Sequence, residues 1–201
     1  MVEVNPVMLK KAFSDLPNCG DSFACWESDG KITLCIVDGL GHGENAEVAA
    51  IAALQYVGSH ISEPLADIFS GCNNEIFRTR GVVMGLAVID RQNATLTYGG
   101  IGNIVARIVT NYPDSPGESM QFIGDTGIVG GGYRRFCEQT VEISPGQLLL
   151  MHTDGIPEHL DISPYPAEIK SDLSKLATAI IDDWGKETDD RAVVIYRYDG
   201  P

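Results

Sequence analysis

The sequence has few basic residues and no long hydrophobic run. Lys and Arg account for 14 of the 201 residues and Asp and Glu for 28, which gives a formal net charge of -14 at pH 7. Because nucleic-acid affinity comes largely from basic side chains that neutralise phosphates, nucleic acid is not expected as a partner. No stretch of about 18 apolar residues occurs, and the start lacks the pattern of a secretory signal. These absences predict a cytoplasmic protein without a membrane partner.

Cysteine pairs and internal repeats are also lacking. The five cysteines are odd in number and form no C-x-x-C pair, which argues against a disulfide framework or a zinc ribbon and predicts reduced, mostly buried thiols.

No repeat, low-complexity tract or long linker divides the chain, so a single domain over residues 1–201 is expected. The loosest stretch, residues 110–119, is predicted to be a surface loop.

Short apolar segments and helical periodicity are what the sequence does contain. The segments 22–28 and 31–38 are strand-like and flank Asp29-Gly30, a dipeptide typical of a tight hairpin turn. Helical spacing of apolar residues marks residues 44–59, 64–77 and roughly 167–184. Further strand-like segments cover residues 82–90, 94–100, 104–110, 136–144, 147–153 and 192–198. Many short strands with segregated helices indicate an α+β fold in which helices cover sheets.

Three aspartates stand at the ends of apolar strands. Asp38 and Asp154 each end such a strand and precede a glycine, and Asp189 lies just ahead of the last strand. A carboxylate in such a place costs free energy unless it is paired or binds a metal. Oxygen ligands without a His or Cys cluster suit Mg²⁺ or Mn²⁺ rather than zinc. Each Asp-Gly pair alone is also a common turn, so only the combination favours a metal site.

These motifs resemble the PP2C-like family of metal-dependent phosphatases, and in particular its bacterial SpoIIE/RsbU-type branch of sporulation and stress-regulating phosphatases. The matching motifs are G-D at 20–21, D-G-L-G-H-G at 38–43, T-D-G at 153–155 and D-D-R-A-V-V at 189–194. Without an attached sensor or membrane region, the sequence is most similar to the stand-alone, RsbX-type members of the stressosome system. The resemblance implies a β-sandwich of two antiparallel sheets flanked by helices, in α/β/β/α layers.

The resemblance also implies a centre of two Mn²⁺ or Mg²⁺ ions. In the family pattern Asp38 bridges both ions, and the carbonyl group of Gly39 binds one of them. Asp154 and Asp189 hold the other ion, and Asp21 binds metal directly or through water. Two such ions activate a water molecule and neutralise the phosphoryl group, so that no covalent enzyme intermediate is needed.

The sequence departs from the animal relatives at several positions. Gly20 stands where they carry an acidic ligand, and no arginine matches their phosphate-binding arginine, so phosphate is expected to rest mainly on the metals. His42 is displaced from their motif histidine and is expected to support its loop. Asp190 is expected to point away from the metal bound by Asp189. On a regular strand His152 faces the same way as the aspartate two residues later, and roles in the core and beside the metals both stay open.

The resemblance predicts a protein serine/threonine phosphatase. Its expected substrates are phosphorylated STAS-domain proteins of a stressosome, which would make it a negative-feedback regulator of a stress response. One alternative is a phosphatase of an anti-anti-sigma factor. Another is a catalytically silent phosphoprotein-binding module, although a pure binder gains nothing from an uncompensated acidic cluster.

Overall fold

Two five-stranded antiparallel sheets form the centre of the molecule. The computed structural model describes residues 6–15, 17–110, 112 and 119–201. One sheet has the strand order β1-β12-β11-β6-β7 and the other the order β10-β5-β4-β3-β2. The strands of the first sheet are β1 (Val7–Lys11), β6 (Val105–Val109), β7 (Ser119–Phe122), β11 (Leu148–His152) and β12 (Arg191–Arg197). Those of the second are β2 (Asp21–Ser28), β3 (Lys31–Gly39), β4 (Val82–Asp90), β5 (Thr95–Ile101) and β10 (Glu138–Glu142).

The apolar strands supply the cores on both of their faces. In β3, Ile32, Leu34 and Ile36 pack between the two sheets, while Cys35 and Val37 pack under the helices on the opposite face. This division follows from the alternation of side chains along a strand. A strand covered on both faces is apolar throughout, which explains the continuous hydrophobic run that precedes Asp38.

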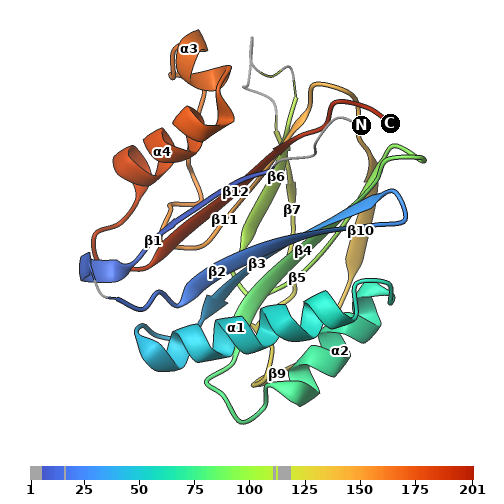
Figure 1. Cartoon of the computed structure of the whole chain (residues 1–201), viewed down its shortest axis with the longest axis vertical. Coiled ribbons are helices and arrows are strands. Elements are labelled where there is room, and N and C mark those ends of the chain that lie inside the picture. The colour runs from blue at the N-terminus through green and yellow to red at the C-terminus, as the bar shows by residue number, and fades with distance from the viewer. Residues whose placement is uncertain (1–5, 16, 111, 113–118) are drawn as a thin grey trace.

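Helices cover the outer faces of both sheets (Figure 1). The helices α1 (Glu44–Ser59) and α2 (Leu65–Glu75) cover the second sheet, and α4 (Leu173–Trp184) covers the first. The short helix α3 (Ala167–Lys170) precedes α4. The layers are therefore α/β/β/α, and the predicted α+β sandwich is confirmed.

Most predicted elements are present, and the differences have local causes. Asp29 and Gly30 both have positive φ, 52° and 75°, as the predicted hairpin turn requires. The single helix predicted over 167–184 is wrong, because Asp172 accepts the N–H groups of Ser174 and Lys175 and starts a new helix. The short elements β1, β7, η1 (Phe13–Asp15), β8 (Gly127–Ile128) and β9 (Gly132–Tyr133) were not predicted. The predicted loop 110–119 lies largely outside the described residues, and its last residue begins β7.

The thiol prediction is confirmed. All five cysteines are free, and Cys19, Cys35 and Cys72 are buried, whereas Cys25 and Cys137 are half-buried. Burial raises the pKa of Cys72 to about 12, so this thiol stays protonated and unreactive near neutral pH. Over the residues described above, no helix combines the length and the hydropathy needed to cross a bilayer.

Candidate metal centre

Two of the predicted ligands face each other across the β2–β3 hairpin. Asp21 stands opposite Asp38 in the antiparallel register of the two strands. Residues directly opposite point to the same face of a sheet, with Cβ atoms about 4.5–5.5 Å apart. Asp21 is only 1% exposed, and burial followed by the charge of Asp38 raises its pKa well above the ordinary value. The hairpin therefore brings two carboxylates together in a place with little water.

The other two predicted aspartates come to the same end of the sandwich. Burial, followed by the charges of Asp154 and Asp189, raises the pKa of Asp38 to about 7. Burial and the charge of Asp154 also raise the pKa of Asp189. Like charges in a desolvated place disfavour the ionised form, and a bound cation relieves that repulsion. The four carboxylates thus form one electrostatically coupled group, which we call the acidic cluster: Asp21, Asp38, Asp154 and Asp189.

Gly39 is required by a close approach of helix α1. A side chain at this position would collide with the carbonyl group of Ala46, in the first turn of the helix. The N–H of Gly39 donates to the carbonyl oxygen of Gly20 (3.0 Å), which joins the end of β3 to the start of β2. The backbone of the D-G motif is therefore held from two sides, beside the acidic cluster.

Two residues that were not predicted as ligands fix this arrangement. Thr153 donates its hydroxyl hydrogen to Asp21 Oδ2 (2.6 Å) and accepts the N–H of Ala192 (2.9 Å). Asp190 accepts the N–H groups of Phe13 and Gly20, each at 2.7 Å, and so ties the segment before β2 to the start of β12. These contacts position the cluster rather than extend it. Thr153 belongs to the T-D-G motif and Asp190 to the D-D-R motif, so the motifs point to both residues. The motifs do not indicate which residues these two side chains bind.

The neighbouring aspartates 189 and 190 serve different partners. The carboxylate of Asp190 is buried and bonded to backbone N–H groups, whereas Asp189 is half-buried and accepts the N–H of Asp190 through Oδ1 (3.0 Å). A carboxylate whose two oxygens each already accept an N–H group is less free to bind a cation. Of the two, Asp189 is the better placed to act as a ligand.

Neither histidine of interest joins the acidic cluster. His152 is fully buried, with Nδ1 2.9 Å from the carbonyl oxygen of Thr153 and Nε2 3.4 Å from Arg107 Nη2. Burial lowers the pKa of His152 to about 4, so the ring is neutral at pH 7. Of its two open roles, the structure places it in the core. His42 is exposed and its ring lies 5.5 Å from that of Phe13, in agreement with a role in supporting its loop.

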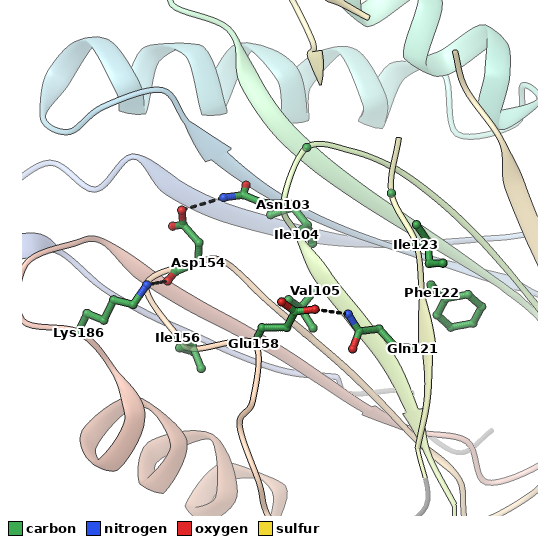
Figure 2. A pocket seen from close by; sticks show the side chains of 12 residues that line it. Asn103, Ile104, Val105, Gln121, Phe122, Ile123, Asp154, Ile156, Glu158 and Lys186 are labelled. Carbon is green, nitrogen blue, oxygen red and sulfur yellow. Dashed lines mark hydrogen bonds between the residues drawn. The ribbon is translucent and has the colours of Figure 1, made fainter. Parts of the chain in front are cut away.

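Asp154 borders a pocket of about 470 Å³ (Figure 2). Its Oδ2 accepts the side-chain amide of Asn103 (2.8 Å), and its carbonyl oxygen accepts Lys186 Nζ (2.5 Å). Figure 2 shows Asp154 and Lys186 at one side of the pocket, with Ile123 at the other. Through Asp154, the acidic cluster thus borders a space that can admit a ligand.

The chemistry of these donors fits a hard divalent cation. Four carboxylates and a backbone carbonyl are the oxygen ligands that Mg²⁺ and Mn²⁺ prefer. Within the described residues, no three side chains of His, Cys, Asp or Glu stand close enough together to hold one ion as they are arranged. As they are arranged, Asp21 accepts a hydrogen bond from the hydroxyl group of Thr153, and Asp154 accepts one from the side-chain amide of Asn103.

Comparison with known proteins gives concordant results. Residues 28–199 match the family described as Stage II sporulation protein E (SpoIIE). The chain is 28% identical to the phosphoserine phosphatase RsbX of Bacillus subtilis (strain 168) over 170 aligned residues. The alignment covers 82% of this chain and 83% of RsbX.

Solved structures agree over nearly the whole chain. A chain from the bacterial stressosome, a modular system that has been adapted to control secondary messenger signaling, superposes with a TM-score of 0.85 and 27% identity, covering 97% of this chain and 100% of that one. RsbX in complex with magnesium superposes with a TM-score of 0.78 and 21% identity, covering 98% and 99%. The family match spans most of the sequence, so the chain belongs to the SpoIIE family of proteins with the PP2C-like fold.

Proposed function

We propose that this protein is a metal-dependent phosphatase that hydrolyses phosphoserine or phosphothreonine on a partner protein. The observation that carries the proposal is the acidic cluster, in which burial and neighbouring carboxylates raise the pKa of Asp21, Asp38 and Asp189, while Asp154 borders an open pocket. Perturbed carboxylates that gather in a cleft are typical of functional sites rather than of packing. The 28% identity with the phosphoserine phosphatase RsbX supports the same chemistry.

The ligands would be those of the family pattern, and two ions of Mn²⁺ or Mg²⁺ are expected. Asp21, Asp38, Asp154 and Asp189, with the carbonyl group of Gly39, would hold them. When bound, such cations activate water and neutralise phosphoryl charge. The existence of an RsbX structure in complex with magnesium supports a divalent cation here.

The remaining residues of the site prepare the reaction without taking part in it. Thr153 and Asp190 keep the strand ends in place through buried hydrogen bonds, so the ligands are positioned before substrate arrives.

In the reaction, a water oxygen attacks phosphorus, the bond from phosphorus to the serine oxygen breaks, and that oxygen receives a proton. The products are the free hydroxyl side chain and inorganic phosphate.

The proposed substrates are phosphorylated STAS-domain proteins of a stressosome. The protein would then act in the cytoplasm as a single domain of residues 1–201 and would give negative feedback on a stress response. Support comes from the identity with RsbX and from the similarity to a chain of the bacterial stressosome. Parallel assays with a phosphorylated STAS scaffold and a phosphorylated anti-anti-sigma factor would test this choice, and cleavage of the second alone would reject the stressosome assignment.

The enzymatic proposal is tested by phosphate release during a Mn²⁺ titration. The substrates are p-nitrophenyl phosphate and a phosphoserine peptide, and the variants are Asp38→Asn and the control Asp29→Asn, which keeps the hairpin turn. We expect metal-dependent turnover in the wild type and the control, and its loss in Asp38→Asn. If the wild type releases no phosphate from either substrate at any Mn²⁺ concentration, the proposal is wrong and the silent binding module takes its place.

A further inference from the structure

The pocket beside Asp154 has two ends of different character. It lies between the acidic cluster and the edge strand β7 (Figure 2), and its volume of about 470 Å³ is within the usual range for ligand sites. We infer that this pocket binds the phosphorylated segment of the protein substrate, with Lys186 at the phosphate group and Ile123 against an apolar side chain beside the phosphoserine. The inference rests on the proposed function and specifies how its substrate is recognised.

Of the described residues that line the pocket, Lys186 is the one that carries a positive charge. It belongs to the loop between α4 and β12, and its backbone is fixed because its N–H donates to the carbonyl oxygen of Gly155 (2.8 Å) and its own carbonyl accepts Arg191 Nη1 (2.5 Å). The side chain is exposed, and its amino group reaches the carbonyl oxygen of Asp154. A cation on an anchored backbone can turn from this carbonyl to a phosphate oxygen, which is a stronger acceptor.

The charge of Lys186 lies beside the acidic cluster. Its amino group is 2.5 Å from the carbonyl oxygen of Asp154, one of the four residues of the cluster. In a protein with a net charge of -14, a cation at this point offsets the repulsion that an incoming phosphate dianion meets. Lys186 would thus supply the positive charge that the phosphate-binding arginine provides in the animal relatives and that no arginine of this sequence matches.

The opposite end of the pocket is apolar and exposed. Ile123, directly after β7, lines the pocket and is 75% exposed. Among the described residues, the other exposed large hydrophobic side chains are less exposed than Ile123 and do not line the pocket: Val48, Ile51, Phe77 and Met120. The carbonyl oxygen of Ile123 accepts Gln139 Nε2 (2.8 Å), so a fixed backbone presents this side chain. Exposed apolar residues at the rim of a polar site mark a binding surface.

Polar groups occupy the space between the two ends. Glu158 Oε1 accepts the side-chain amide of Gln121 (2.9 Å), and both residues line the pocket (Figure 2). The carbonyl groups of Glu158 and Leu160 accept the guanidinium of Arg107 at 3.2 and 2.9 Å, which fixes this loop. A carboxylate acceptor and an amide donor match the N–H and C=O groups of an extended peptide. Along the pocket, a cation is followed by polar groups and then by an apolar side chain. This order fits a phosphopeptide better than free phosphate.

The phosphate end is tested with Lys186→Met, Lys186→Arg and the control Lys175→Met, an exposed lysine in α4. Inorganic phosphate is used as a competitive inhibitor of p-nitrophenyl phosphate hydrolysis in saturating Mn²⁺. Loss of a charge-assisted hydrogen bond should raise the inhibition constant of phosphate about 10-fold or more in Lys186→Met. Lys186→Arg should restore much of this affinity, and Lys175→Met should match the wild type. An unchanged inhibition constant in Lys186→Met would overturn the assignment.

The apolar end is tested with paired phosphoserine peptides that carry Leu or Ser next to the phosphoserine. The wild type should favour the Leu peptide in kcat/KM by about 10-fold. Ile123→Ser should remove this preference, whereas Val48→Ser, a control on the exposed face of α1, should keep it. Both side chains are largely exposed, so neither substitution is expected to impair folding. Hydrolysis of both peptides at equal rates by the wild type would overturn this inference alone. Absence of metal-dependent phosphate release from p-nitrophenyl phosphate and from both peptides would overturn the proposed function and this inference together.

Discussion

One hydroxyl group joins three parts of the candidate metal centre. Thr153, just after β11, donates to Asp21 at the start of β2 and accepts the N–H of Ala192 in β12. Because all three residues are buried, none of these groups can turn to water for a partner. The orientation of Asp21 therefore depends on a residue 132 positions away in the chain.

Replacement of Thr153 by Val should weaken both the fold and the metal site. The shape is kept, but Asp21 Oδ2 and the N–H of Ala192 lose their partner, and a buried unsatisfied polar group costs about 1–3 kcal/mol. We expect a loss of unfolding free energy of that order in urea denaturation, and weaker Mn²⁺ binding by titration calorimetry. Thr178→Val, which removes an exposed hydroxyl on α4, should change stability by less than about 0.5 kcal/mol. Equal stabilities of the two variants would show that the buried bridge has no such role.

Single residues differed in how far the sequence could predict them. Asp38 and Asp154 follow apolar strands, so their place near the edge of a sheet could be predicted from the residues, whereas Asp21 was expected only from the resemblance of its G-D motif. Asn103 and Lys186 could not be, since they reach Asp154 from positions 51 and 32 residues away. Contacts of this kind depend on the packing of whole elements, for which periodicity gives no information.

Among the secondary-structure elements, long apolar strands were predictable and short edge strands were not. The edge strand β7 (Ser119–Phe122) has four residues, three of them exposed, so it shows no alternating pattern. The break between α3 and α4 was missed for the opposite reason. Apolar spacing continues across it, with Ile169 before and Leu173 and Leu176 after, and only the capping residue marks the new start.

That capping residue gives a prediction for helix α4. The carboxylate of Asp172 accepts the N–H groups of Ser174 (3.0 Å) and Lys175 (3.2 Å), which have no partner within the helix. Asp172→Ala should lower the unfolding free energy by about 1 kcal/mol, because the N-cap is lost. Asp172→Asn keeps an N-cap oxygen and should stay close to the wild type. Thermal or urea denaturation measures both variants, and a similar loss in the two would assign the effect to charge instead of capping.

At the scale of the whole molecule, the fold gathers four carboxylates at one end of the sandwich. The net charge is -14, and the fold nevertheless brings four carboxylates together beside the pocket. Three hydrophobic cores, one between the sheets and one under each helical layer, stabilise the fold independently of this end. The repulsion between these carboxylates lowers the stability of the folded protein at this end, and a bound cation would relieve it.

This arrangement predicts an inverted pH dependence of stability when metal is removed. The pKa of Asp38 is about 7 in the folded protein against an ordinary value of 3.8, so between these values the folded state binds a proton that the unfolded state does not. The unfolding free energy must then fall as pH rises from about 4 to about 7, and level off above. Burial and neighbouring charge raise the pKa of Asp21 and Asp189, and their contributions have the same sign.

The measurement is urea denaturation in EDTA between about pH 5 and pH 8, with the wild type and Asp38→Asn side by side. Asp38→Asn lacks the titrating group and should gain stability relative to the wild type as pH rises. Saturating Mn²⁺ should stabilise the wild type most at the high end of this range, because the deprotonated carboxylates are the form that binds the cation and binding to the folded state adds to its stability. A difference between the two proteins that stays constant with pH in EDTA would mean that Asp38 ionises normally and that the acidic cluster is not coupled.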